Sequence, residues 1–223
     1  MNVLIFGATG MVGQSVLREC LAAADVSHIT AIGRTPVAVH HAKLIDFQHA
    51  DMWNYDGIDA ALMPFDACFF CLGVSSAGMS EAQYTHLTYD MTIAAATKLA
   101  QLNPQMTFIY VSGAGTDSSE QGRSMWARVK GKTENALLAL PFKAAYMFRP
   151  GGIMPMHGIQ SKTRAYRLLY SLTKPLLPLL HRLFPDQLTT SEKLGLAMLD
   201  VARHGALRRI LESADINKIG TNR

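Results

Sequence analysis

Apolar segments alternate with stretches of helical spacing along most of the chain. The apolar segments occupy 1–6, 28–34, 43–47, 65–73, 106–112 and 142–148. Nearly continuous runs of this kind are typical of strands buried on both faces of a parallel sheet. The longest helical stretch is predicted over 81–102, with Ser80 as its N-cap and Asn103-Pro104 after its end.

Three glycines lie between the first apolar run and the first helical stretch. Gly7 permits a tight turn, Gly10 lets the backbone approach a pyrophosphate, and Gly13 lets the helix pack closely on the strand. The amino end of the helix would offer free N–H groups and a positive dipole end to phosphate. An ordinary tight turn is the alternative. The cofactor-binding candidates at this turn are Gly7, Thr9, Gly10, Met11, Val12 and Gly13.

Alternation of strand and helix from Met1 to about Leu140 predicts an α/β fold. We expect a Rossmann-like, doubly wound parallel sheet with helices on both faces and a small helical C-terminal segment on the substrate side. The chain should form one NAD(P)-binding domain over 1–223, with 151–190 as a helical flap. A last helix is predicted over about 191–204, capped by Thr190 or Ser191, and a short strand from Arg209.

The end of the second predicted strand favours NADP(H) over NAD(H). NAD-specific turns usually carry an acidic residue there, whereas this chain has Gly33-Arg34-Thr35. A guanidinium matches a 2′-phosphate, and no carboxylate is expected nearby to repel one. The alternative is an arginine that is merely solvated. Asp46 and Phe47 are expected to flank the adenine, and Leu72 and Gly73 form a turn where the backbone could pass close to the cofactor.

Composition and charge narrow the class of protein. The 223 residues are 49% hydrophobic and carry a net charge of +4, which describes a globular protein with a diffuse basic balance. A small-molecule substrate is expected and nucleic acid is not, because there is no basic stripe. Because Met1 opens directly onto the first core strand, we expect no signal peptide and a cytoplasmic location.

Three cysteines, an odd and low number, argue against a disulfide framework and for a reducing compartment. Cys68 and Cys71 have C-x-x-C spacing, but strand alternation would send the two sulfurs to opposite faces. No metal site is predicted.

The glycine turn, Ser112 after the fifth strand, Lys130 on the next helix and Arg149-Pro150-Gly151 together carry a family likeness. The chain resembles the extended and atypical short-chain dehydrogenase/reductase superfamily, in its small NAD(P)-dependent epimerase/dehydratase-like branch. The resemblance implies that Ser112 hydrogen-bonds the substrate carbonyl and that Lys130 grips the nicotinamide ribose. It also implies that the turn containing Pro150, Gly151 and Ile153 lies near the nicotinamide amide.

One residue departs from this family pattern. The pattern is Tyr-x-x-x-Lys, and four residues before Lys130 this chain has Trp126. The tyrosine passes a proton to or from the substrate, whereas an indole N–H can only donate a hydrogen bond. Another acid could stand in, with Tyr84, Tyr89, Tyr110 or a water held by Ser112 as candidates. Alternatively the protein binds cofactor without chemistry, or the alignment is shifted. The Tyr-x-x-x-Lys spacing itself occurs once in the sequence, at Tyr170 and Lys174, outside the helix where the family pattern places it.

The segment 166–184 combines a leucine stripe at helical spacing with basic residues and prolines. Its charges and prolines argue against a transmembrane span, and two short helices broken near Pro175 fit better. The first interpretation is a flap over an apolar substrate pocket. A homodimer face and a weak membrane-surface contact are the alternatives, so a monomer and a homodimer both remain open.

Three functions follow from these features. The first is an NADP(H)-dependent oxidoreductase acting on a small, largely apolar carbonyl or alcohol compound, with Ser112, Lys130 and Trp126 at the catalytic positions. The second is a non-catalytic NADP(H)-sensing regulatory or binding protein, which Trp126 favours. The third is a peripheral membrane enzyme acting on a lipid or quinone.

Overall fold

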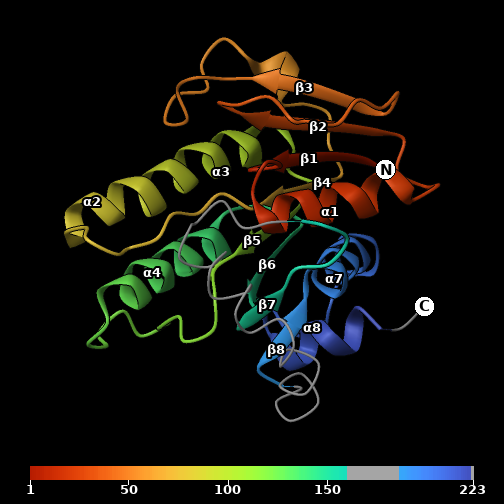
Figure 1. Ribbon diagram of the computed structural model, residues 1–223. Helices are drawn as coiled ribbons and strands as arrows, with labels where there is room; N and C mark the ends of the chain where they lie inside the picture. Colours follow the sequence, from red (N-terminus) through yellow and green to blue (C-terminus); the bar gives the residue numbers. More distant parts are fainter. Residues whose placement is uncertain (160–185, 222–223) are drawn as a thin grey trace.

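A seven-stranded sheet forms the centre of the computed structural model, which describes residues 1–159 and 186–221. Its strands, in chain order, are β1 Asn2–Phe6, β2 His28–Gly33, β3 Leu44–Gln48, β4 Ala67–Phe70, β5 Thr107–Val111, β6 Ala144–Arg149 and β9 Ile210–Glu212. The spatial order is β3-β2-β1-β4-β5-β6-β9, and all neighbouring strands are parallel (Figure 1). This arrangement confirms the predicted Rossmann-like α/β fold.

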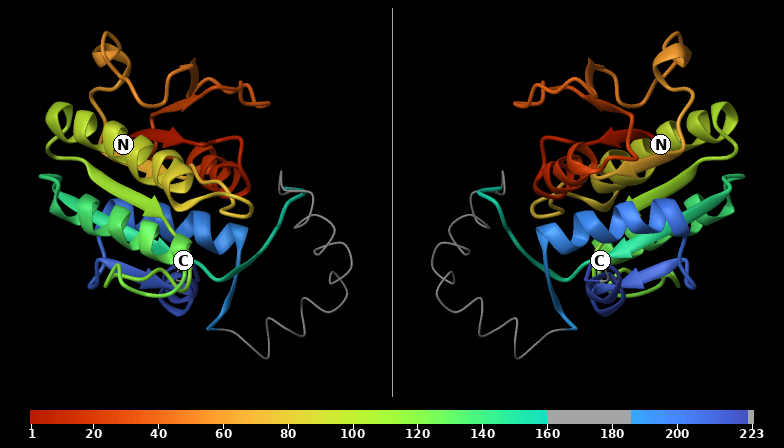
Figure 2. Two further views of the ribbon diagram at one scale, coloured as in Figure 1. Left: turned by 90° about the vertical axis from the view of Figure 1, so that its left-hand side faces the viewer. Right: turned by 90° about the vertical axis from the view of Figure 1, so that its right-hand side faces the viewer.

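Helices cover both faces of the sheet. They are α1 Met11–Ala22, α2 Glu81–Thr85, α3 Met91–Leu102, α4 Met125–Ala139, α7 Ser191–His204 and α8 Ser213–Ile219, with a short 3₁₀ turn η1 at Asp59–Ala61. Figure 2 shows the three layers, with α3 and α4 on one side of the sheet and α1 and α7 on the other. The crossovers through α3 and α4 therefore lie on one face of the sheet and the crossover through α1 lies on the other, as in a doubly wound fold.

The first strand explains why the sheet is apolar on both faces. Val3 and Ile5 pack in the core beneath α1 and α7, whereas Leu4 and Phe6 pack in the core beneath α3. Successive side chains of a strand point to opposite faces, so an unbroken apolar run can fill both cores at once. Cys68 packs in the second core and Cys71 against the first, as the alternation predicted.

The helical stretch predicted over 81–102 is present but interrupted. Ser80 caps it, because its hydroxyl oxygen accepts a hydrogen bond from the Gln83 amide at 3.3 Å and its own amide donates to the side-chain oxygen of Gln83 at 3.0 Å. Between α2 and α3 lies a single π-helical turn, η2 His86–Asp90. Such a wide turn is common at functional sites, and periodicity alone does not reveal it.

The C-terminal third adds elements that the sequence did not predict. A two-stranded parallel sheet joins β7 Gly152–Met154 to β8 Leu188–Thr190, and α8 follows β9. The predicted last helix is confirmed as α7, where the Thr190 hydroxyl accepts a hydrogen bond from the Lys193 amide at 3.1 Å. The stripe over 166–184, with the helices expected there, lies outside the described residues.

Helix α1 packs unusually close to the turn that precedes it. A Cβ built on Gly13 would lie 2.1 Å from the carbonyl oxygen of Gly7 and 2.8 Å from the Cα of Ala8. These neighbours are backbone atoms that side-chain rotation cannot relieve. Only glycine therefore fits at this position.

We expect Gly13→Ala to displace α1 and to lower the thermal midpoint by about 5 °C or more, because overpacking costs about 1–3 kcal/mol. Gly73→Ala is the matched control, since a Cβ there meets nothing within 4 Å. Circular dichroism melts of the two variants measure the difference. Equal midpoints would contradict the close packing of α1.

Candidate functional site

The glycine turn joins the carboxyl end of β1 to the amino end of α1. Gly7 has a φ of +78°, a backbone conformation that L side chains rarely adopt. A Cβ on Gly7 would lie 2.9 Å from the backbone of Cys71 and Leu72, just after β4. The turn closes with a hydrogen bond from the Gly10 amide to the Gly7 carbonyl oxygen at 2.9 Å. The turn therefore sits tightly between β1 and β4.

The amino end of α1 is suited to an anion. Its N-cap is Gly10, no side chain caps it, and its first turn carries no acidic residue. Met11 and Val12 are partly exposed there. The N–H groups of a first helical turn have no partner within the helix, and the helix dipole places positive charge beside them. This end of α1 can accept a diphosphate.

A cavity of about 260 Å³ opens in front of this turn. It lies where β1, β2 and β4 end, which is where a doubly wound sheet binds its ligand. Its lining is made of residues 7–10, 31–35 and 71–74, together with Val37, Asp46, Met52, Trp53, Leu87 and Met91. The structure thus brings Gly7, Thr9, Gly10, Arg34, Asp46, Leu72 and Gly73 of the predicted cofactor residues to one cavity.

The lining of the cavity includes both a cation and an anion. Arg34 is exposed and forms no ion pair with any described residue. Asp46 lines the same cavity and accepts a hydrogen bond from the Val37 amide at 2.9 Å. The expectation that no carboxylate lies near Arg34 was therefore wrong. Sequence distance hid it, because β2 and β3 are neighbours and both end here.

Phe47 does not share this cavity. Its side chain packs against the core beneath α3, whereas Asp46 is exposed. Adjacent residues of a strand point to opposite faces, so the two cannot both flank one ring. The cavity walls that the sequence did not predict are Met52, Trp53, Leu87 and Met91. The aromatic Trp53 in a polar segment was the one available signal.

Ser112 and Lys130 come together, but not as a free catalytic pair. The Lys130 ammonium donates a hydrogen bond to the backbone carbonyl of Ser112. The Ser112 hydroxyl is buried, donates to the Glu134 carboxylate at 2.5 Å and lies 3.2 Å from the Phe148 carbonyl oxygen. The hydroxyl that the resemblance assigns to a substrate carbonyl is thus bonded to protein.

The Glu134 carboxylate is the centre of a buried network. Arg149 donates to it through Nε at 3.0 and 3.1 Å and also through Nη2. Glu134 is fully buried and Arg149 is 8% exposed. Arg149 also donates to Ser118 at 2.6 Å and pairs with Glu212 at 3.4 Å. Such a pair is costly to break, because one charge would then stay buried alone.

Burial perturbs Lys130 strongly. Removal from water lowers its pKa to about 8, and the nearby Glu134 opposes part of that shift. Lys130 and Glu134 are one turn apart on α4, so they share a face. The amine therefore titrates much nearer to neutrality than an ordinary lysine.

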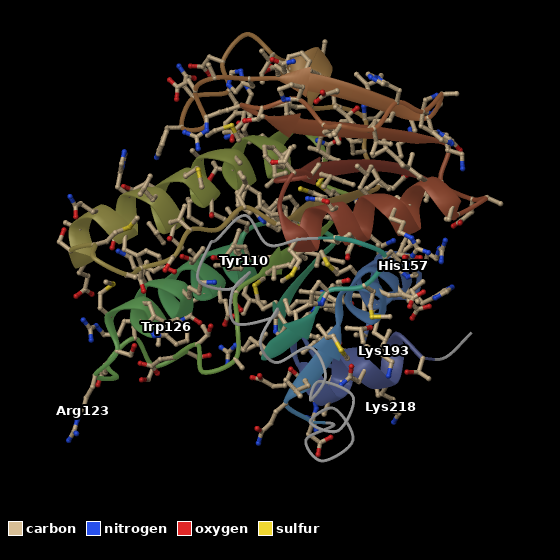
Figure 3. All side chains as sticks on the ribbon, viewed as in Figure 1. Tyr110, Arg123, Trp126, His157, Lys193 and Lys218 are labelled. Carbon is tan, nitrogen blue, oxygen red and sulfur yellow. The ribbon has the colours of Figure 1, made fainter. Side chains whose placement is uncertain are left out.

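Trp126 lies in α4 one turn before Lys130 (Figure 3), which is the position where the resemblance led us to expect a tyrosine. Its ring lies against Gly115, since a Cβ there would be 3.4 Å from the indole. None of the three tyrosines considered as replacements lines the cavity of the described chain. Tyr84 and Tyr110 are buried, and burial raises the pKa of both phenols.

Tyr89 is held elsewhere as well. Its ring faces the Lys132 ammonium, which is 4.4 Å from the ring centre. Of the three candidates, Tyr84 and Tyr110 are thus buried and Tyr89 is engaged by Lys132.

The predicted nicotinamide turn packs against the C-terminal elements. The Pro150 carbonyl accepts a hydrogen bond from the Ala114 amide at 2.9 Å, which ties this turn to the loop after β5. The Gly151 amide donates to the Ser213 hydroxyl at 2.7 Å, and Ile153 lies in β7. Pro150, Gly151 and Ile153 are thus near Ser112 in the fold but do not line the 260 Å³ cavity.

Within residues 1–159 and 186–221, no helix has the length and apolar character needed to cross a membrane. The same residues contain no group of three or more histidine, cysteine and acidic side chains that could hold a metal ion.

Comparison with known proteins gives a family match. The model of the family described as NAD(P)H-binding matches residues 7–144. Protein fmp52, mitochondrial, of Emericella nidulans is 31% identical over 157 residues, which cover 67% of this chain and 66% of the relative. Protein HTATIP2 of Rattus norvegicus is 26% identical over 160 residues, which cover 69% of this chain and 63% of the relative. The matched part thus spans about two thirds of the length of these relatives.

Solved structures share the fold at low identity. UDP-glucuronic acid 4-epimerase from Bacillus cereus, in complex with NAD, has a TM-score of 0.69 at 12% identity and covers 95% of this chain and 76% of its own. A short chain dehydrogenase family protein from Francisella tularensis has a TM-score of 0.66 at 15% identity, with 92% and 91% covered. Together these matches confirm the predicted resemblance to the atypical short-chain dehydrogenase/reductase branch.

The comparisons also correct the expected location. The fmp52 relatives of Emericella nidulans, Eremothecium gossypii and Kluyveromyces lactis are all named mitochondrial proteins. The cytoplasmic location predicted from the sequence was therefore wrong. The inference had relied on the absence of a recognisable signal peptide, which does not decide between compartments.

The lowered pKa of Lys130 has a measurable effect on stability. Between its folded pKa of about 8 and its ordinary value, the unfolded chain binds the proton more than the folded chain does. The free energy of unfolding should therefore rise with pH through this window. We expect the free energy of unfolding of the wild type, relative to that of Lys130→Met, to rise by on the order of 1 kcal/mol from pH 7.5 to pH 10.

Urea unfolding at both pH values measures this difference. Lys132→Met is the control, because the Lys132 ammonium lies over the Tyr89 ring instead of bonding to Ser112. An identical pH dependence in the wild type and Lys130→Met would contradict a perturbed Lys130.

Proposed function

The chain belongs to the NAD(P)H-binding family, and on that premise we propose that it is an oxidoreductase that uses NADP(H) in preference to NAD(H). Its substrate would be a small, largely apolar carbonyl or alcohol compound. The observation that carries the proposal is a cavity lined both by the glycine turn and by Arg34, which has no ion-pair partner among the described residues.

The residues at the glycine turn fit the cofactor diphosphate. A Cβ on Gly10 would approach only the Gly7 carbonyl oxygen, at 3.4 Å, so the side facing the cavity is open for a ligand. The uncapped first turn of α1 supplies N–H donors and no acidic side chain opposes them. This donor set supports binding of a dianionic diphosphate.

Arg34 supports the choice of NADP(H). A guanidinium can donate two parallel hydrogen bonds to a 2′-phosphate, which a ribose hydroxyl cannot match in charge. Asp46 is the group that would oppose this preference. One of its oxygens accepts a hydrogen bond from the Val37 amide, and the carboxylate could accept a further hydrogen bond from the adenine amino group.

When bound, NADPH supplies a hydride to a carbonyl carbon, and the residues of this chain position the reactants. Lys130 is held by the Ser112 carbonyl at the end of β5. The Ser112 hydroxyl is bonded to Glu134, and Trp126 offers only an N–H donor. Among these described residues only Lys130 titrates near neutrality, and no phenol stands one turn before it. We therefore expect turnover to be slower, by about 10²–10⁴, than at a site with a positioned phenol.

The apolar substrate is supported by the sequence after β7. Apolar residues recur at helical spacing through 165–183, the part of the chain that supplies the substrate pocket in the resembled superfamily. Sugar nucleotides would need several polar contacts, so a carbonyl compound with an apolar body is the better match.

A second function is favoured by the state of Ser112. If neither its hydroxyl nor Trp126 can serve a substrate, the protein would bind NADP(H) and pass that signal to a partner. Incubation of the pure protein with NADPH and a panel of aliphatic and aromatic carbonyl compounds separates the two functions. Turnover of any compound excludes the sensor, whereas micromolar binding of NADPH without turnover argues against the enzyme.

We expect Arg34→Gln to weaken NADP⁺ binding by about 10- to 100-fold, because a hydrogen bond to a charged group contributes about 1.5–3 kcal/mol. NAD⁺ binding should change little. Arg123→Gln is the matched control, since this exposed arginine lies beside α4 and away from the cavity (Figure 3). Calorimetry with both dinucleotides tests this, and equal wild-type affinity for NAD⁺ and NADP⁺ would count against the proposed preference.

Trp126→Tyr should raise NADPH-dependent carbonyl reduction by about 10²-fold or more, because it places a phenol one turn before Lys130. Trp126→Phe, which removes the indole without adding an acid, is the control. Steady-state kcat/KM on the best compound of the panel measures the gain. If the tyrosine and phenylalanine variants have the same kcat/KM, the missing acid does not limit the site.

A further inference from the structure

The cavity contains an aromatic wall that the cofactor residues predicted from the sequence do not include. Trp53 follows β3, in the segment that leads to η1, and lines the cavity together with Arg34 and Asp46. Its side chain is partly buried. We propose that the indole of Trp53, held in place by His86, is the surface on which the adenine ring of the cofactor stacks. This inference rests on the proposed function.

The Trp53 ring is fixed before any ligand arrives. It stacks on the His86 ring with 4.9 Å between centres and 10° between planes, and its Nε1–H donates to the His86 carbonyl oxygen at 3.1 Å. The Trp53 amide donates to the Asp51 carboxylate at 2.9 Å. The indole has no other polar group, so it offers the cavity only apolar aromatic surface. A ring held this way loses little conformational entropy on binding.

His86 is itself held by the π-turn between α2 and α3. Its Nδ1 lies 3.1 Å from the Asp90 carboxylate, four residues later in the same turn. Leu87, from this turn, also lines the cavity. The wide turn thus presents one residue to the cavity and its neighbour to Trp53, which gives the interruption of the helix a role in the site.

The position of Trp53 selects adenine over nicotinamide. The diphosphate belongs at the amino end of α1, and Arg34 marks the adenosine side through the 2′-phosphate. Lys130, which the family resemblance assigns to the nicotinamide ribose, lies instead with Ser112 after β5. A base that stacks on an aromatic side chain gains about 1–3 kcal/mol, which corresponds to roughly 5- to 150-fold in affinity.

The test uses adenosine 2′,5′-bisphosphate, which carries the adenine and the 2′-phosphate but no nicotinamide. We expect Trp53→Leu to weaken its binding about tenfold or more in calorimetry, and Trp53→Phe to stay within about threefold of the wild type. Tyr89→Leu is the matched control. Tyr89 lies on the π-turn that carries His86, but its ring packs under Lys132, outside the cavity lining of the described residues. It should leave binding unchanged.

Fluorescence gives a readout that does not depend on removing the ring. The chain has two tryptophans, so a Trp126→Phe background leaves Trp53 as the single emitter. Saturating adenosine 2′,5′-bisphosphate should quench it. Unchanged binding by Trp53→Leu, or unchanged Trp53 emission at saturation, would overturn the stacking while NADP⁺ binding stands. A wild type that binds neither NADP⁺ nor the bisphosphate would instead refute the proposed function on which the stacking rests.

Discussion

The contact between Gly13 and the Gly7 carbonyl oxygen decides where the first helix begins and where it points. Because no Cβ fits there, α1 packs against the turn and its uncapped amino end faces the carboxyl ends of β1 and β4. The parallel sheet brings the ends of β2 and β3 to the same edge. The close approach of α1 and the order of the strands together form the cavity and bring the glycine turn and Arg34 into its lining.

A second constraint acts at the other end of the site. The buried Glu134–Arg149 pair links α4 to β6, and the Ser112 hydroxyl donates a further hydrogen bond to the same carboxylate. A buried charge that lost a partner would cost several kcal/mol, so Ser112 is more valuable to the fold as a donor to Glu134 than as a free hydroxyl. Stability therefore competes with the role that family resemblance gives to this serine.

Short-range patterns in the sequence predicted most of the strands and helices. Unbroken apolar runs located the strands, Ser80 and Thr190 capped the helices as predicted, and the glycine spacing located the turn. What failed depended on contacts between distant segments. Asp46 lines the same cavity as Arg34 only because β2 and β3 are neighbours. Glu134 pairs with Arg149 only because α4 packs against β6. The π-turn and the Trp53–His86 stack likewise have no signature in hydrophobic spacing.

Cofactor binding and proton transfer depend on different side chains of this site. In the proposed binding mode, the glycine turn holds the diphosphate, Arg34 the 2′-phosphate and Trp53 the adenine, and all three line one cavity. Proton transfer depends on groups beyond the nicotinamide, at Ser112 and Trp126. Because neither Ser112 nor Trp126 belongs to the set that holds the diphosphate, the 2′-phosphate and the adenine, a missing acid need not weaken cofactor binding. A chain of this family can therefore keep its cofactor while its chemistry slows or its use changes.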